Sequence, residues 1–171
     1  MKRTVASEQF FTSVATAQKC VAAVERLFPF EQFDLIVEPS AGAGAFLQFL
    51  PISNRIGLDI APLHADIVKQ DFLAWQPREE FHTILTIGNP PYGQRAALAA
   101  KFIAHACSFS EVVAFILPQS FNKYTFQNRV PRNFHLQNSF NCDQFETPTG
   151  QQLIVKSVFQ IWEKQATPRQ I

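Results

Sequence analysis

Residues 33–46 read FDLIVEPSAGAGAF, an apolar run, a turn of small residues and the start of a helix-like run from Ala45 to Leu50. The apolar run predicts a buried strand. Gly42 and Gly44 can adopt positive φ and let a ligand approach the backbone closely, and the helix start behind them offers N–H groups without partners. The full Gly-x-Gly-x-x-Gly signature of nucleotide-binding folds is absent, because Leu47 occupies its third glycine position. The stretch predicts a ligand site at the carboxyl end of a strand.

Two further segments carry polar residues. Residues 55–60, RIGLDI, read as a short strand that ends in the carboxylate of Asp59, about 20 residues after the first turn, where a doubly wound fold places the acid that binds ribose hydroxyls. Residues 70–73, QDFL, bring together a carboxamide, a carboxylate and an aromatic ring suited to the edge and face of an adenine. Little room remains between Asp59 and Asp71 for a crossover helix, so we expect an abbreviated connection there.

The hexapeptide GNPPYG, residues 88–93, follows a third apolar run. Two consecutive prolines hold φ near about −65° and remove two backbone donors, so the carbonyls around them are rigid acceptors. Asn89 precedes a proline and is therefore expected to be extended. This geometry suits gripping an exocyclic amino group through its two hydrogens, with Tyr92 stacked on the ring that carries it. A proline-rich turn without function is the alternative.

Together these segments resemble the S-adenosylmethionine-dependent methyltransferases that modify exocyclic amines, and most closely the gamma-type adenine-N6 DNA methyltransferases. The resemblance covers nearly all of the chain and implies S-adenosyl-L-methionine as cofactor, with S-adenosyl-L-homocysteine as product. The catalytic residues it implies are Asn89, Pro90, Pro91 and Tyr92. The cofactor-binding residues it implies are Thr12, Glu38, Pro39, Ser40, Gly42, Gly44, Asp59, Ile60, Asp71, Phe72 and Asn89.

Individual roles follow from the same resemblance. Asp59 is expected to accept from the ribose hydroxyls, and Asp71 from the adenine amine with Phe72 beside the ring. Glu38 is expected near the methionine ammonium and Thr12 near its carboxylate. Three further segments are also similar to the family: residues 9–13 to the cap over the methionine end, residues 115–121 to the strand and loop after the catalytic helix, and Phe145 to Trp162 to the last hairpin beside the target-base pocket.

Length and the 47% apolar content predict one domain over residues 1–171, and the resemblance implies that it is a methyltransferase catalytic domain. Helices are expected from Thr12 to Leu27 and from Gln94 to Ala106, and strands near 33–38, 55–60, 66–69, 82–88, 111–117, 133–140 and 153–162. The fold class is α/β: a single-domain, Rossmann-like, doubly wound and mostly parallel seven-stranded sheet with a C-terminal antiparallel hairpin.

Other features of the composition limit the function classes. The three cysteines are widely spaced with no metal-binding pattern, so we expect reduced thiols and no metal. No apolar run reaches membrane-spanning length and no signal-peptide core follows Met1. We therefore expect no membrane partner and a soluble, intracellular protein, cytoplasmic or, in a eukaryote, nuclear.

Charge is distributed unevenly between the two parts of the chain. Residues 1–118 carry nine Lys/Arg against eleven Asp/Glu, whereas residues 119–171 carry six against three. Basic side chains interleaved with rings suit a stacked nucleotide strand, although a solvated loop with core aromatics explains the pattern equally well. The expected substrate-binding residues are Tyr92, Gly93, Phe121, Lys123, Tyr124 and Phe145.

The sequence thus favours methyl transfer to the N6 amine of adenine in nucleic acid, with DNA preferred. Structured or ribosomal RNA is the main competing acceptor, because RNA adenine methyltransferases share the Asn-Pro-Pro-aromatic loop. Protein glutamine-N5 methylation and a non-catalytic, methyltransferase-like subunit of a complex also fit the residues. The chain ends within ten residues of Trp162, where gamma-type enzymes carry a recognition domain, so we expect a partner protein or the shape of an RNA to supply target recognition.

Overall fold

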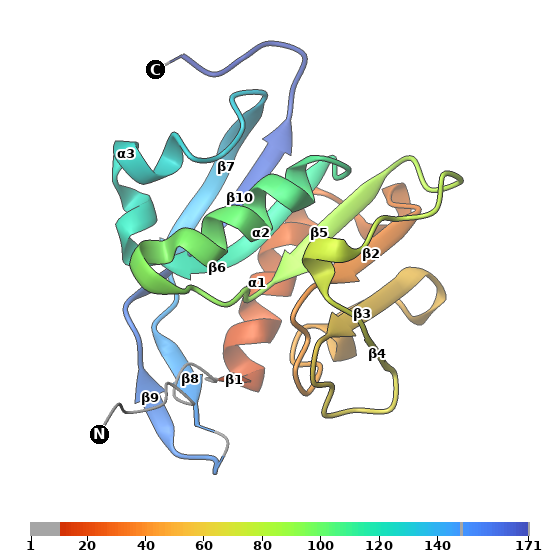
Figure 1. The fold of residues 1–171 in the computed structure, drawn as a ribbon, viewed down its shortest axis with the longest axis vertical. Coiled ribbons are helices and arrows are strands. Elements are labelled where there is room, and N and C mark those ends of the chain that lie inside the picture. The colour runs from red at the N-terminus through yellow and green to blue at the C-terminus, as the bar shows by residue number, and fades with distance from the viewer. Residues whose placement is uncertain (1–10, 148, 171) are drawn as a thin grey trace.

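The computed structural model describes residues 11–147 and 149–170, the side chain of Gln144 excepted. Its main feature is a seven-stranded sheet in the order β4-β3-β2-β5-β6-β10-β7 (Figure 1). Neighbouring strands from β4 to β6 are parallel, and β10 is antiparallel to both β6 and β7. The strands are β2 (Leu35–Glu38), β3 (Arg55–Asp59), β4 (Ile67–Lys69), β5 (Ile84–Gly88), β6 (Val112–Pro118), β7 (Phe134–Asn141) and β10 (Ser157–Lys164). The predicted fold class is confirmed.

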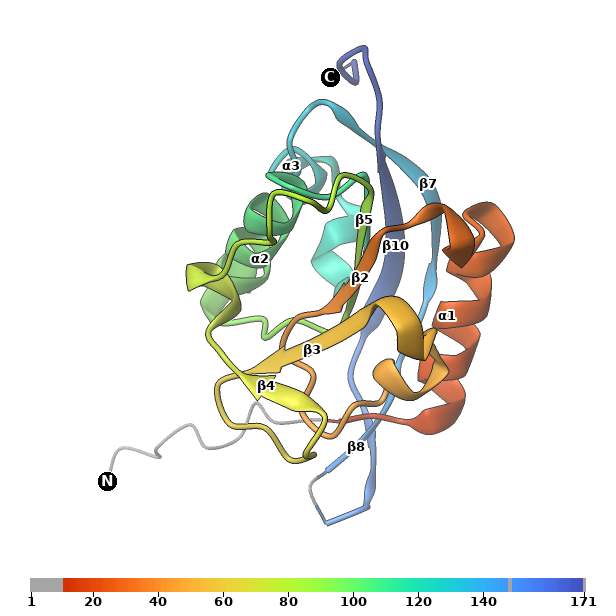
Figure 2. The ribbon, with the colours of Figure 1, turned by 90° about the vertical axis from the view of Figure 1, so that its right-hand side faces the viewer.

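Helices cover both faces of this sheet. Figure 2 shows α1 on one side of the strands and α2 with α3 on the other. Each face of the sheet has its own hydrophobic core. Successive side chains of β2 point to opposite faces, so Ile36 packs into the core that contains α1, and Leu35 and Val37 pack into the core that contains α2. Burial on both faces explains why the inner strands β2, β5 and β6 read as mostly apolar runs. The helices are α1 (Val14–Leu27), α2 (Ala97–Cys107) and α3 (Tyr124–Gln127).

The connections on the β2-β3-β4 side are short. No α-helix joins β3 to β4, as predicted from the spacing of Asp59 and Asp71. The helix-like run from Ala45 to Leu50 is not an α-helix, which corrects the prediction: only a 3₁₀ turn forms, over Leu47–Phe49. Pro51 follows at once, so the run has room for little more than one turn before the chain must become extended.

A second, small sheet has the order β1-β8-β9 and lies below the large one in Figure 1. Its strands are β1 (Phe11–Thr12), β8 (Gln144–Glu146) and β9 (Gln152–Ile154). The expected strand over 153–162 is therefore split, and the expected hairpin from Phe145 to Trp162 is corrected: β10 pairs with β7, while β8 and β9 form their own hairpin. Two backbone hydrogen bonds join the two chain segments that connect these hairpins. Cys142 N–H donates to the Ser157 carbonyl (2.9 Å), and Val155 N–H donates to the Asp143 carbonyl (3.0 Å).

None of the helices within residues 11–147 and 149–170 is long and apolar enough to cross a membrane.

Candidate active site

The residue that distinguishes this site is Asn89, directly after β5. Its Nδ2 donates to the hydroxyl of Thr12 in β1 (3.3 Å), and Thr12 pairs in turn with Phe145 of β8. Its Oδ1 is buried, and no described residue donates a hydrogen bond to it. A buried acceptor without a donor costs about 1–3 kcal/mol, and such groups are rare in folded proteins. The end of a central strand therefore holds a buried acceptor with no donor among the described residues.

Thr12 is thus placed beside Asn89, and it is 8% exposed. Its expected contact was the cofactor carboxylate. The hydroxyl oxygen accepts from the Asn89 amide, and a hydroxyl that accepts still has its own hydrogen to donate. The sequence did not predict that Thr12 would orient Asn89, because the contact joins residues 77 positions apart.

Tyr92 is held by its side chain and by its backbone. Its hydroxyl lies 2.9 Å from the Ser157 Oγ on β10, and its carbonyl accepts from the N–H groups of Leu98 (3.1 Å) and Ala99 (3.2 Å). Burial raises the pKa of the Tyr92 phenol, so the group stays neutral. The ring is half-buried against the core cluster that contains α2. Ser157 had no sequence signal, since nothing in residues 88–93 specifies what the hydroxyl reaches.

The turn after Tyr92 is strained. Gly93 has φ +70°, and a Cβ placed there would lie 2.7 Å from the Leu98 Cβ, so only glycine fits. Arg95 and Ala96 also have positive φ, +51° and +59°. Left-handed backbone costs about 1–2 kcal/mol for each residue that carries a Cβ, and such strain concentrates at functional sites. The strain lets α2 begin within a few residues of the Asn-Pro-Pro-Tyr tip.

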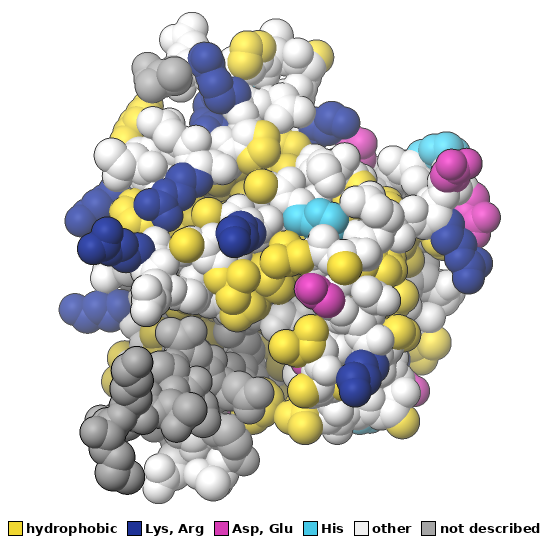
Figure 3. Space-filling view, viewed as in Figure 1, with side chains coloured by type: hydrophobic (Ala, Val, Ile, Leu, Met, Phe, Trp, Pro, Cys, Tyr) yellow, Lys and Arg dark blue, Asp and Glu magenta, His cyan; other side chains and the backbone are white. Residues whose placement is uncertain are grey.

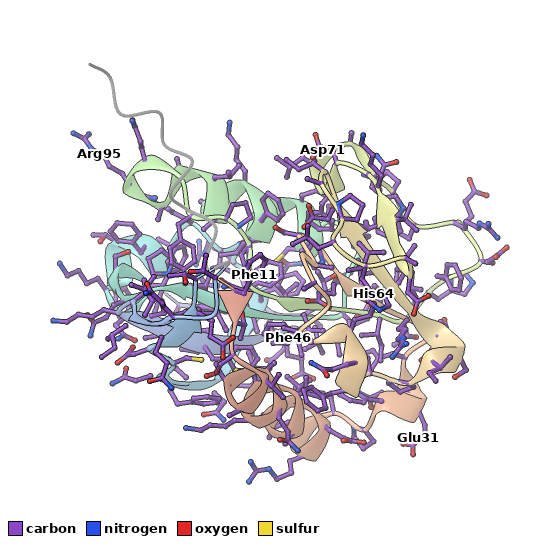
Figure 4. The ribbon with its side chains drawn as sticks, turned by 90° about the horizontal axis from the view of Figure 1, so that it is seen from below. Phe11, Glu31, Phe46, His64, Asp71 and Arg95 are labelled. Atoms are coloured by element: carbon purple, nitrogen blue, oxygen red, sulfur yellow. The ribbon has the colours of Figure 1, made fainter. Side chains whose placement is uncertain are left out.

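The glycine turn after β2 meets β3 and β1. Ser40, Gly42 and Gly44 all have positive φ. Gly42 N–H donates to the Asp59 Oδ2 (2.7 Å), which ties the turn to the end of β3. A Cβ on Gly42 would lie 3.3 Å from a ring carbon of Phe11, so this ring covers the turn. Figure 4 shows Phe11 near the centre of this end of the molecule. Its neighbours Gln9 and Phe10, also expected in the cap, lie outside the described residues.

Glu38 is buried between the glycine turn and β5. Its carboxylate accepts from the N–H groups of Leu47 (2.7 Å) and Phe46 (3.4 Å), and a Cβ on Gly88 would lie 3.3 Å from its Cγ. Burial raises the pKa of this carboxyl to about 8, although the two N–H donors work in the opposite direction. The N–H groups expected to be free at the helix start are thus partly used by Glu38, which the sequence did not predict. A nearby cation would favour the ionised form of this carboxyl.

Asp59 and Asp71 lie at the ends of adjacent segments, since the Gln70 N–H donates to the Asp59 carbonyl (2.9 Å). The Asp59 carboxylate accepts from Gly42 and from the Ala61 N–H (2.8 Å), and each oxygen keeps a further lone pair. The next residue, Ile60, is 69% exposed. Asp71 is exposed and caps a short 3₁₀ turn through the Leu73 N–H (3.0 Å). The roles of the two carboxylates toward a nucleoside stay predictions.

The predicted role of the Phe72 ring, beside the adenine of the cofactor, is corrected by the structure. Its ring is 2% exposed and is enclosed by other aromatic rings, stacked on Phe102 with ring centres 5.2 Å apart and edge-on to His105 at 4.9 Å. It is part of the core that joins the 3₁₀ turn to α2, so the ring does not lie open for a cofactor. As the first residue of that turn, Phe72 has a backbone N–H with no partner inside it.

The expected substrate-binding residues divide into two groups. Lys123 and Tyr124 are exposed, Tyr124 at 66%. Phe121 (0% exposed) and Phe145 (1%) are core residues, which corrects both assignments. Phe121 packs under α3 against Phe126 with ring centres 5.6 Å apart, and Phe145 lies in the cluster that contains α1. The aromatic residues of this region were correctly noted, but most of them build the core.

Comparison with known proteins supports the fold. No protein-family model matches the sequence, and a search of curated proteins by sequence finds no match either. Solved structures do match. A proposed RNA methyltransferase from Pyrococcus horikoshii superposes with TM-score 0.71 at 16% identity, over 98% of this chain and 90% of that one. The 23S rRNA methyltransferase ErmE gives 0.61 at 17% identity, over 95% and 72% of the two chains.

A third match has a different acceptor. The magnesium protoporphyrin IX methyltransferase from Synechocystis, with bound S-adenosylmethionine, gives TM-score 0.59 at 11% identity over 89% and 79% of the chains. The chain therefore has the fold of class I S-adenosylmethionine-dependent methyltransferases. Proteins with this fold act on unlike acceptors, so the acceptor must be argued from the site.

Proposed function

We propose that this protein is an S-adenosylmethionine-dependent methyltransferase that acts on the exocyclic N6 amine of adenine in nucleic acid. The observation that carries the proposal is the buried Oδ1 of Asn89, to which no described residue donates a hydrogen bond. An amine hydrogen of the substrate would satisfy that oxygen. Asn89 follows β5, and the glycine turn follows the neighbouring parallel strand β2. The methyl acceptor at Asn89 and the methyl donor at the glycine turn would therefore meet at adjacent strand ends.

The residues around the glycine turn fit the cofactor. Glu38 would hold the ammonium group, Gly42 and Gly44 would pass under the methionine chain, and Asp59 would accept from the ribose hydroxyls. Asp71 would accept from the adenine amine, and the exposed side chain of Ile60 would cover the base. When bound, S-adenosylmethionine supplies a methyl group that its sulfonium already activates. The protein's task is therefore placement.

Asn89 and Pro90 would prepare the acceptor. The N6 lone pair of adenine is delocalised into the ring, which makes the nitrogen planar and a poor nucleophile. If the Asn89 Oδ1 and the Pro90 carbonyl each accept one N6 hydrogen, the nitrogen is favoured in a pyramidal form with its lone pair free. Thr12 would keep the amide oxygen on the substrate side, and Tyr92 would stack on the base. A paired adenine must first leave the duplex, at a cost of a few kcal/mol, which a single-stranded target avoids.

RNA stands beside DNA as an acceptor to be tested. The residues favour DNA by resemblance, whereas two of the matching structures, which cover 98% and 95% of this chain, bear names of RNA methyltransferases. The same loop also suits the side-chain amide of a protein glutamine, so the test must include proteins.

The test is transfer of a tritium-labelled methyl group from S-adenosylmethionine to total RNA, single-stranded DNA, duplex DNA and a protein extract, followed by mass spectrometry of the labelled product. N6-methyladenine in RNA or DNA, lost in the Asn89→Ala variant, is the expected result. If the label is found only in N5-methylglutamine, the acceptor is a protein glutamine and the proposed adenine acceptor is wrong. An absence of label in every acceptor, with cofactor binding intact, would indicate a non-catalytic subunit.

A further inference from the structure

The surface around α3 carries an excess of positive charge. Residues 82–142 contain five Lys/Arg and a single acid, Glu111. That acid lies just before β6, and its Oε1 is 3.9 Å from the Lys164 Nζ. It is therefore neutralised at the far end of β6 from α3. We call the exposed side chains of Arg95, Lys123, Arg129 and Arg132 the basic face.

The basic face adjoins the catalytic turn. The Arg129 Nη1 donates to the carbonyl of Arg95 (3.1 Å), and Arg95 is two residues beyond Gly93. Lys123 directly precedes α3. Figure 3 shows Lys and Arg side chains gathered over α3 and the nearby start of α2, with the Asp and Glu side chains of this view elsewhere. A polyanion bound along this face would run beside the Asn-Pro-Pro-Tyr tip.

Two aromatic residues in α3 make the face suited to bases as well as phosphates. Tyr124 is 66% exposed, so its ring is open to stacking by a base. The Arg129 guanidinium lies 4.2 Å from the centre of the Phe126 ring, which fixes its plane while most of its five N–H donors remain for other acceptors. An acidic peptide would satisfy the charges alone, whereas a nucleotide strand uses both the charges and an exposed ring.

We propose that the basic face binds single-stranded nucleic acid that flanks the target base, with Lys123 and Arg129 on phosphates and Tyr124 stacked on a neighbouring base. This inference rests on the proposed function in one respect: the base that is methylated is taken to belong to the nucleic-acid strand that the basic face binds. It replaces the buried Phe121 and Phe145 of the sequence prediction with side chains that a strand can reach. Non-specific binding of single strands elsewhere combines the same two elements, a positive surface and stacking rings.

The experiment measures fluorescence anisotropy of a labelled single-stranded RNA, a DNA of the same sequence and its duplex, each over a range of salt concentrations. Lys123→Gln and Arg129→Gln should each weaken binding severalfold at low salt and reduce the slope of log K against log[salt] by about 0.7, the value for one phosphate contact on a single strand. Tyr124→Ala should weaken binding about tenfold and leave the slope unchanged.

The matched control is Arg78→Gln, which removes an equally exposed charge from the connection before β5. The Arg78 side chain is 82% exposed and lies 3.7 Å from Glu80. This variant should bind as the wild type does. Circular dichroism of each variant shows whether it is folded. If Arg129→Gln does not fold, Lys123→Gln still tests the inference, because the Lys123 side chain is exposed.

The outcomes separate the inference from the proposed function. Tighter binding of the RNA or of the DNA strand supports the inference and identifies the sugar. A preference for the duplex, equal competition by polyglutamate, or losses no larger than those of Arg78→Gln would overturn it. If strand binding follows the expected pattern but no methyl group is transferred, the proposed function fails and the inference stands. If methyl transfer occurs while the basic-face variants bind and react normally, the inference fails and the function stands.

Discussion

The unused acceptor on Asn89 leads to a prediction in which stability and activity change differently. Asn89→Ala removes the hydrogen bond to Thr12 (3.3 Å), a loss of about 0.5–1.5 kcal/mol. It also removes a buried oxygen that has no donor among the described residues, which relieves about 1–3 kcal/mol. The free energy of unfolding should therefore change by between about −0.5 and about +2.5 kcal/mol, and the upper value is equivalent to a rise in Tm of about 5–10 degrees for a chain of this length.

Activity should fall sharply in the same variant. Removing one hydrogen-bonding group that acts on the reacting atoms commonly costs about 10²–10³ in rate, and we expect at least the lower figure for methyl transfer. Cofactor affinity should change little, because the proposed contacts of the cofactor lie mainly on the glycine turn and β3. Urea denaturation, tritium transfer and calorimetric titration of S-adenosylmethionine measure the three quantities.

Asn54 is a matched control within the same chain. Its Oδ1 is likewise buried with no donor among the described residues, and its Nδ2 donates to the Phe33 carbonyl (2.9 Å). Asn54→Ala should therefore change stability by a similar amount while methyl transfer stays at the wild-type rate. If Asn89→Ala is at least about 2 kcal/mol less stable than Asn54→Ala, or keeps full turnover, Asn89 is a structural residue and the reasoning fails.

Three further predictions concern neighbouring groups. Ser157→Ala removes a partner of the Tyr92 hydroxyl (2.9 Å) and should lower the free energy of unfolding by about 1 kcal/mol; a double-mutant cycle with Tyr92→Phe should show a coupling energy, and fully additive losses would contradict the contact. Glu38 has a pKa of about 8 in the folded protein against an ordinary value of 4.5, so the folded state holds a proton that the unfolded state releases, and stability should fall as pH rises from about 5 to about 8. Urea denaturation at several pH values should show a shallower decline for Glu38→Gln, and an unchanged decline would refute the assignment. Asp59→Asn should weaken calorimetric binding of S-adenosylmethionine about tenfold, whereas Asp66→Asn, in the exposed connection that follows, should not; equal affinities in the two variants would remove the ribose role.

Most of the fold was predictable because the strands are buried on both faces. Continuous apolar runs with polar residues at their ends indicated where β2, β3 and β5 stop, and those ends fix where a ligand can bind. The boundaries that failed lie where the chain changes partners, at the split between β9 and β10 and at the 3₁₀ turn over Leu47–Phe49. Backbone hydrogen bonds of Cys142 with Ser157 and of Val155 with Asp143 decide the first place, and local propensity carries no information about them. At the second place, Pro51 limits the helix-like run.

The aromatic residues show the limit of prediction for the site. Phe72, Phe121 and Phe145 have the same chemistry as exposed stacking residues, but the structure buries all three, whereas Tyr124 remains exposed. Burial of a ring depends on which helix packs over it, and a helix as short as α3 leaves almost no periodic signal in the sequence. The assignment of a ring to core or surface therefore required the tertiary structure.

The sequence by itself determined the local geometry of the chain: prolines that hold Asn89 at a strand end, glycines that permit the turn after β2, and carboxylates after two strands. These depend on the dihedral preferences of consecutive residues, which the sequence contains directly. Only the tertiary structure decided that Thr12 orients the Asn89 amide, that Ser157 holds Tyr92 and that Glu38 is buried with a raised pKa. Such contacts arise from packing between distant segments. The exclusion of water from them raises the pKa of Glu38 and makes the buried Asn89 Oδ1 costly to leave without a donor.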